Sequence, residues 1–359
     1  MKNIVLILAL LAAMQSAQQS RVHAYGDALN RQTRVVGSAV PVSATAAPLS
    51  GHHPFVSIAC RFADIAARPN SLSFFRQMYS ANYPGLDDYW REVSNGHIDI
   101  TGSTAFGWYT LPHDLGYYVT SADHLYTIAK DCTDLADGAI DYNQFDGINI
   151  MLNTDVDGFA YGGGIYMRLD GTLKDWRMTW EPPWSYQNIT TIAHEMGHAF
   201  GLQHSLYRGY EYGNQFDVMS DMWTGCDNAT DAIYGCLGQS VIAYDKNYLG
   251  WMDGRTISIA RPRTVVAIER TELPPATGYL MGIVSIDETH YFTIETRKQA
   301  GYDKKLPLDA VVIHVIDTAT EYPFFVKALR LGETWTSKGG VTFYVRSETA
   351  TGFVIVISQ

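Results

Sequence analysis

Cysteine is scarce in this chain of 359 residues: it occurs four times and never as a Cys-x-x-Cys pair. The missing pairs exclude dithiol redox catalysis and metal sites built from cysteine clusters. Basic residues are also few, since 26 Lys and Arg stand against 37 Asp and Glu, for a net charge of −11. A chain this acidic repels phosphate backbones, so nucleic acid is not an expected partner.

Long apolar runs are confined to the beginning of the chain. Ile4–Met14 is apolar, follows Lys2 and precedes the small residues Ser16 and Ala17. This order is typical of a secretory signal peptide, here residues 1–17, and the run is too short to cross a bilayer comfortably. We therefore expect a secreted, extracellular protein (periplasmic in a bacterium) without stable membrane insertion after signal removal. An uncleaved membrane anchor is the alternative.

The cysteines are Cys60, Cys132, Cys226 and Cys236. An even number in a secreted chain predicts two disulfide bonds, for which three connectivities exist. Cys226 and Cys236 are close together and flanked by Asp, Asn and Gly, so we pair them across a local loop. That choice leaves Cys60 with Cys132. Free buried thiols are the alternative, which an oxidising compartment disfavours.

The organisation of the chain changes near residue 54. Residues 18–50 are rich in Ala, Ser, Val and Gln without a helical or strand period, which is typical of a flexible pro-segment or linker. Residues 54–252 alternate strand-like and helical runs, which indicates an α/β layer structure. The runs are Phe55–Cys60, Ser71–Glu92, Ile98–Thr101, His124–Ala136 and Ile148–Leu152.

Residues 253–359 are different again, because short β-rich runs are separated there by Gly, Pro or Asp. The runs are Thr264–Ile268, Tyr279–Ile286, Tyr291–Thr296, Val311–Ile316, Val341–Val345 and Phe353–Ile357. We expect this part to form a separate all-β domain of the β-sandwich type.

One stretch carries the chemistry. Residues 194–204 read His-Glu-Met-Gly-His-Ala-Phe-Gly-Leu-Gln-His and fit H-E-x-x-H-x-x-G-x-x-H at every position. Residues four apart share a helix face, so His194 and His198 can present imidazoles to one Zn²⁺. Glu195 is turned by about 100°, which places it beside the metal and over a bound water. Gly201 can adopt a positive φ and end the helix, and the returning chain brings up His204.

Three histidine ligands leave a fourth position for water, so the pattern predicts one catalytic zinc rather than a structural one. Glu195 is then the catalytic base. The alternative is a surface helix whose histidines bind nothing. Five fixed residues at this spacing occur by chance in roughly one chain of this length in ten thousand, at about 1/20 per position.

The motif resembles the metzincin zinc signature. Other segments resemble, in the same order, those of secreted gametolysin-like and immune-inhibitor-A-like metallopeptidases. They are Asp88–Gly96, Gly107–Pro112, Tyr212–Met219, Leu249–Met252, Tyr291–Asp303 and Val312–Val315, so the likeness covers about residues 54–359. The resemblance implies a zinc metalloendopeptidase that hydrolyses peptide bonds in proteins. It also implies a metzincin fold, with a twisted mixed sheet and an active-site helix, before the C-terminal β domain.

The same resemblance implies a Met-turn beneath the zinc, for which Met219 is the candidate; an ordinary core methionine is the alternative. Two departures stand out. No cysteine precedes Cys60, so the cysteine that caps the zinc in some family members is absent, and His23 and Asp27 are the candidates for latency. Asp221 stands two residues after Met219, where some metzincins place a tyrosine.

Three consecutive glycines, Gly162, Gly163 and Gly164, precede the motif. An edge strand above a zincin cleft can pair with an extended substrate, and glycines there would permit close approach. A simple mobile loop is an equal alternative. No Gly-Lys-Ser/Thr follows, so this is not a phosphate-binding loop.

Two other functions stay open on the sequence alone. One is a catalytically restricted binding or adhesion protein on a zincin scaffold, and the other is a zinc hydrolase that acts on a non-peptide bond. All ligands and the base are present, so no loss of the zinc site is visible. Calcium has little support, because the candidate ligands Asp227, Asp231 and Asp245 match no calcium-loop motif. The oligomeric state does not follow from the sequence.

Overall fold

The computed structural model describes residues 22–27, 48–224, 226, 230–260, 262–320 and 322–359. The predicted signal peptide, residues 1–17, lies outside these ranges, as does Asp227. None of the helices in the described ranges has the length and apolar character needed to cross a membrane. The chain forms a mixed α/β structure with several sheets, and its C-terminal part consists largely of strands.

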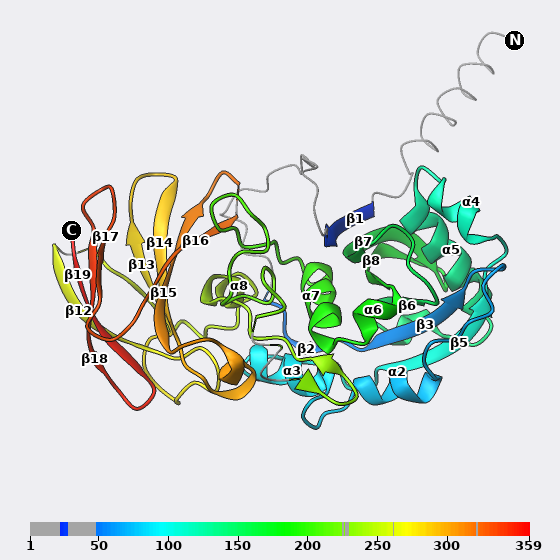
Figure 1. The fold of residues 1–359 in the computed structure, drawn as a ribbon, viewed down its shortest axis with the longest axis horizontal. Coiled ribbons are helices and arrows are strands. Elements are labelled where there is room, and N and C mark those ends of the chain that lie inside the picture. The colour runs from blue at the N-terminus through cyan, green and yellow to red at the C-terminus, as the bar shows by residue number, and fades with distance from the viewer. Residues whose placement is uncertain (1–21, 28–47, 225, 227–229, 261, 321) are drawn as a thin grey trace, which may run out of the picture.

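A six-stranded mixed sheet forms the right-hand part of the molecule in Figure 1. Its order is β1 (Val22–Asp27), β7 (Ala160–Leu169), β8 (Thr172–Glu181), β6 (Gly147–Leu152), β3 (Phe55–Arg61) and β5 (Thr104–Thr110). The last four strands are parallel, whereas β7 and β1 are antiparallel to their neighbours. The interior strands β6 and β3 are neighbours in this sheet, and their near-continuous apolar sequences are typical of strands covered on both faces.

Helices cover both faces of this sheet. α5 (His124–Ala136) packs on one face, where Ile128 joins a cluster with Ile58 and Ile150. The other face is covered by α2 (Leu72–Met78), α3 (Leu86–Val93) and α7 (Ile189–Ala199). The described residues also form two 3-10 helices, η1 (Tyr142–Gln144) and η3 (Gly301–Lys305). They form three further short helices: α4 (Leu115–Val119), α6 (Pro183–Tyr186) and α8 (Ala243–Tyr248).

The predicted elements of this region are largely confirmed. The helix predicted over His124–Ala136 has those bounds in α5. The helical run Ser71–Glu92 is two helices, because Pro84 and Gly85 interrupt it before α3 begins at Leu86. The strand predicted at Ile98–Thr101 shortens to β4 (Ile98–Asp99), which pairs with β2 (Gly51–His52).

The C-terminal part contains two sheets that share one apolar core. The first has the order β11 (Thr256–Ser258), β13 (Met281–Ser285), β14 (His290–Arg297), β15 (Ala310–Asp317) and β16 (Pro323–Leu329). The second has the order β12 (Arg263–Glu269), β19 (Gly352–Ser358), β18 (Thr342–Glu348) and β17 (Thr334–Thr336). Ile294 and Ile313 of the first sheet pack with Phe343 and Ile355 of the second. All six predicted strands are present.

The disulfide pairing is confirmed. Cys60 of β3 is bonded to Cys132 of α5, which ties the sheet to its covering helix. Cys226 is bonded to Cys236, which lies in the small hairpin of β9 (Thr230–Asp231) and β10 (Gly235–Cys236).

Residues 18–50, which show no strand period and are predicted to be a flexible pro-segment or linker, include one strand at Val22–Asp27. These residues form β1 and pair antiparallel with β7, from Val22 opposite Ile165 to Asp27 opposite Ala160. Their sequence has little β character of its own, and the backbone hydrogen bonds come from a partner far along the chain. Residues 28–47 of the predicted pro-segment lie outside the described ranges.

Candidate active site

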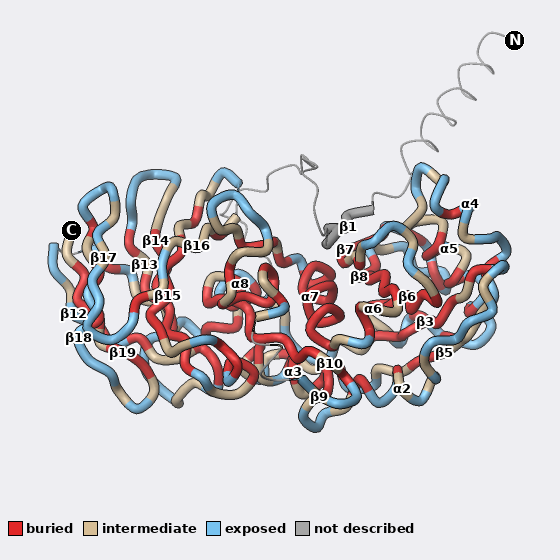
Figure 2. The backbone as a smooth tube through the Cα atoms, in the orientation of Figure 1, coloured by how far each residue is buried: buried red, intermediate tan, exposed pale blue. Residues whose placement is uncertain are grey.

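Helix α7 carries the first part of the motif and is buried along its whole length (Figure 2). In Figure 1 it lies between the six-stranded sheet and the C-terminal sheets. The predicted turn at Gly201 has the geometry expected of a helix end: Gly201 has φ +97°. The amide of Leu202 bonds the carbonyl of Gly197, and the amide of Gly201 bonds that of His198. These two bonds form a Schellman motif, which reverses the chain towards His204.

The three histidines of the motif converge on one point. The Nε2 atoms of His194 and His198 are 3.0 Å apart, those of His198 and His204 are 3.0 Å apart, and those of His194 and His204 are 3.2 Å apart. All three side chains are buried. Within the described residues, no other group of three or more His, Cys, Asp or Glu side chains brings its ligand atoms together in this way.

The outer nitrogens of His194 and His198 have hydrogen-bond acceptors, and that of His204 faces a carboxylate. His194 Nδ1 lies 2.7 Å from the Val218 carbonyl, and His198 Nδ1 lies 2.9 Å from the Leu202 carbonyl. His204 Nδ1 is 3.6 Å from the Glu211 carboxylate. A carbonyl or carboxylate can only accept, so Nδ1 carries the proton and each Nε2 directs a lone pair inward.

Three lone pairs about 3 Å apart repel one another unless a cation lies between them. Two ligands of a tetrahedral Zn²⁺ at 2.0–2.1 Å are roughly 3.3–3.4 Å apart, close to the observed separations. Burial also lowers the pKa of His198 well below its ordinary value, with smaller contributions from His204 and His194. Neutral imidazoles with inward lone pairs are the form that binds a metal, so the residues fit a metal centre.

Glu195 is buried next to His194 on α7. Its backbone packs against β7, since a Cβ atom added to Gly162 would lie 2.0 Å from the Glu195 carbonyl oxygen. Its carboxylate also lies near Tyr161 of β7. Burial and the Asp157 carboxylate raise the pKa of Tyr161, and the Glu195 carboxylate adds to this effect. The predicted base therefore lies between the histidines and β7.

Met219 packs directly beneath the histidine-bearing turn. A Cβ atom added to Gly197 would lie only 2.4 Å from the Met219 sulfur, so a glycine between the two helix histidines lets the methionine approach. Met219 is fully buried, and the carbonyl of Val218 before it is the partner of His194 Nδ1. Met219 therefore lies against the helix turn that carries His194 and His198.

The three predicted strand glycines belong to β7 and not to a loop. Gly162 is required by the close approach of α7, and a Cβ atom at Gly164 would meet the Asp175 carboxylate at 2.6 Å. β7 has β8 on one side and β1 on the other, with Gly162, Gly163 and Gly164 opposite residues 25, 24 and 23. The outer edge of β7 is thus covered by an extended segment of the chain itself.

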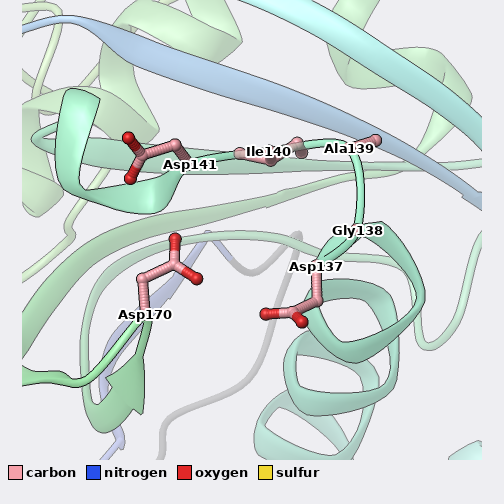
Figure 3. Close-up of a pocket in the computed structure, with 6 residues that line it drawn as sticks. All are labelled: Asp137, Gly138, Ala139, Ile140, Asp141 and Asp170. Carbon is pink, nitrogen blue, oxygen red and sulfur yellow. The ribbon is translucent and has the colours of Figure 1, made fainter.

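Other candidate features do not join the site. The Asp231 carboxylate accepts bonds from the amides of Ile233 and Tyr234, and Asp245 is buried elsewhere. Figure 3 shows an open surface pocket lined by residues 137–141 and Asp170. It has three carboxylates and no histidine, so it is separate from the metal centre.

Sequence reasoning missed the groups around the ligands. The carbonyls of Val218 and Leu202 leave no signal, because every residue has a carbonyl. Glu211 lies in the loop after the motif, and the His204 hydrogen bond lowers the pKa of its carboxyl. One acidic residue in a polar loop has no distinctive spacing, so only the folded chain identifies it.

The buried trio of imidazoles on and after α7 is a group that could hold a metal ion. The family model of gametolysin peptidase M11 matches residues 58–275, which is more than half of the chain and includes the whole motif. The chain belongs to the gametolysin peptidase family and is a metallopeptidase, as the sequence resemblance implied.

Solved structures similar to this chain include OgpA from Akkermansia muciniphila. One crystal form of the wild-type protein has a TM-score of 0.34 at 10% identity, and the match covers 80% of this chain and 99% of the OgpA chain. A second crystal form has a TM-score of 0.31 at 10% identity, and the match covers 85% of this chain and 96% of the OgpA chain. Catalytically inactive OgpA in complex with an O-glycopeptide substrate, glycodrosocin, has a TM-score of 0.30 at 8% identity, covering 79% of this chain and 94% of its own. Scores this low say nothing about the site. No curated protein matches the chain.

Proposed function

We propose that the protein is a secreted zinc metalloendopeptidase that cleaves peptide bonds within proteins, with zinc held by His194, His198 and His204. The observation that carries the proposal is the convergence of three buried Nε2 atoms at 3.0–3.2 Å, each on a ring whose Nδ1 faces a carbonyl or carboxylate. Buried nitrogen lone pairs in this arrangement require a cation. Three neutral imidazoles favour Zn²⁺ over the oxygen-seeking Ca²⁺ and Mg²⁺.

A zinc ion held by these histidines would polarise the scissile carbonyl of the substrate and lower the pKa of a water molecule. The Glu195 carboxylate would take up a proton from the attacking water and deliver it to the leaving amine. Val218, Leu202 and Glu211 hold the rings in the tautomer that keeps Nε2 available. Met219 supports the ligand-bearing turn from below.

A metzincin assignment agrees with several features of the chain. The mixed sheet has an antiparallel strand, β7, beside the active-site helix, and the methionine lies beneath the ligands. We take residues 54–252 as the catalytic unit and residues 253–359 as the β-sandwich unit. Secretion is supported by the predicted signal peptide and by two disulfide bonds, which form in oxidising compartments.

The outer edge of β7 is our candidate for binding an extended substrate. β1 already pairs there antiparallel, so the edge is geometrically able to accept an extended chain. In this proposal, residues 18–50 act as a pro-segment whose strand occupies the substrate position. That arrangement would provide latency without a cysteine.

The test is casein hydrolysis by the purified protein, with and without a zinc chelator, together with its metal content. We expect one zinc per chain and activity that the chelator abolishes. Glu195→Ala should keep the zinc and lose at least about a thousandfold in kcat, since it removes the base and spares the ligands.

Glu288→Ala is the matched control, because Glu288 is an exposed glutamate in a turn of the C-terminal part. It should retain wild-type activity. Near-normal hydrolysis by Glu195→Ala would contradict the mechanism. Stoichiometric zinc without hydrolysis of any protein substrate, even after removal of the pro-segment, would favour the binding or adhesion alternative.

A further inference from the structure

The loop that follows the motif is attached to the C-terminal sheet. Leu206, two residues after His204, forms a parallel bridge with Phe324 on the outer strand β16. The Leu206 amide bonds the Pro323 carbonyl at 2.8 Å, and the Phe325 amide bonds the Leu206 carbonyl at 2.7 Å. The chain that leaves the third ligand thus continues the edge of a sheet built from residues far downstream.

Asn214 connects this loop to the same sheet. Its Nδ2 lies 2.9 Å from Ser205 Oγ and 2.9 Å from Nε2 of His314 on β15. Its Oδ1 accepts a bond from the Phe216 amide. Asn214 and His314 are buried, and the two amide hydrogens of Asn214 serve Ser205 and His314, so the two groups define one geometry.

The Met-turn is held from the same side. Arg297 of β14 is fully buried, donates two bonds to the Asp303 carboxylate, and donates to the carbonyls of Phe216 and Ser240. The Val218 amide bonds that same Ser240 carbonyl. Val218 in turn accepts the Nδ1 proton of His194, so the contacts lead from the C-terminal sheet to a metal ligand.

We propose that the C-terminal sheet is part of the metal centre, with His314 and Asn214 as positioning residues that hold the His204 loop and Arg297 as the positioning residue of the Met-turn. This role rests on the proposed zinc site. It differs from a recognition role for the β domain, because the contacts face inward to the ligand loops. Loss of these contacts should leave the His204 loop less well positioned and weaken metal binding. Replacing residues that orient metal ligands typically lowers metal affinity by about 10–100-fold.

The experiment measures zinc affinity of the full chain by competition with a chromophoric chelator, and the visible spectrum after Co²⁺ substitution. Asn214→Ala and His314→Leu should each weaken zinc binding at least about tenfold and alter the Co²⁺ bands. His314→Gln keeps an acceptor towards Asn214 and should restore most of the affinity.

Ile313→Val is the matched control. Ile313 is adjacent to His314, equally buried, and packs in the core between the two C-terminal sheets. It should lower the melting temperature and leave zinc affinity and the Co²⁺ spectrum unchanged.

Wild-type zinc affinity and an unchanged Co²⁺ spectrum in folded Asn214→Ala would overturn the positioning role. If His314→Leu does not fold, Asn214→Ala and His314→Gln decide between the outcomes. A wild-type chain that binds no zinc contradicts the proposed function itself, which is a different result from wild-type affinity in the variants.

Discussion

Substitution of Gly162 by alanine tests how closely α7 must lie on β7. The added Cβ atom would lie 2.0 Å from the Glu195 carbonyl oxygen, 2.6 Å from its carbonyl carbon and 2.8 Å from its Cα. An ordinary contact begins near 3.4 Å, so helix and strand must separate by about 1.4 Å. All three atoms are backbone, and no side-chain rotation relieves the overlap.

Two consequences follow from this displacement. Overpacking of this kind costs about 1–3 kcal/mol of unfolding free energy. A shift of about an ångström in a catalytic group can cost about a hundredfold in rate, so we expect kcat/KM to fall by about that factor. The assay combines a fluorogenic peptide substrate, zinc content and urea denaturation.

Gly138→Ala is the control, because a Cβ atom there has no neighbour within 4 Å. Its activity and stability should match the wild type. A Gly162→Ala enzyme with wild-type kcat/KM would show that the approach of α7 to β7 does not position Glu195.

Three further predictions concern stability and latency. Replacing Cys60 and Cys132 by serine opens a loop with a sequence separation of 72 residues, so urea denaturation should show a loss of about 4 kcal/mol. Burial lowers the pKa of Lys305 to about 7, below its unfolded value, so its penalty on the native state is greatest at and below neutral pH and declines as pH rises. Lys305→Met should therefore raise the melting temperature more at pH 6.5 than at pH 9.5. An equal gain at both pH values would contradict the lowered pKa of Lys305. A chain that begins at residue 48 lacks β1 and should have a lower KM for casein than the longer chain, while an unchanged KM would contradict the pro-segment proposal.

The sequence predicted that His194, His198 and His204 come together, because that information is local. The helix period places His194 and His198 on one face. Gly201 has no Cβ atom, so it adopts the observed φ of +97° without strain. The amphipathic pattern predicted α5 with its bounds for the same reason. Such elements depend on residues within one or two turns of each other.

The features that the sequence left open or did not predict depend on contacts between distant segments. β7 contains three glycines, which have low strand propensity, and it is a strand because β8 pairs with it and α7 packs on it. β1 exists through pairing with β7 more than a hundred residues downstream. His314 is a lone histidine in a β-rich run, so nothing in the local sequence relates it to the distant loop that carries Asn214.

On the proposed role of the C-terminal sheet in the metal centre, the bridge between Leu206 and Phe324 also determines when during biosynthesis the enzyme can become active. The ligand loop is made long before β16, its partner more than a hundred residues later in the chain. Domains tend to fold as units while synthesis proceeds from the N-terminus, and this centre is divided between early and late segments. Under that proposal, a cell that makes the protein handles an inert polypeptide through most of translation, and the active centre is completed only when the final strands have folded.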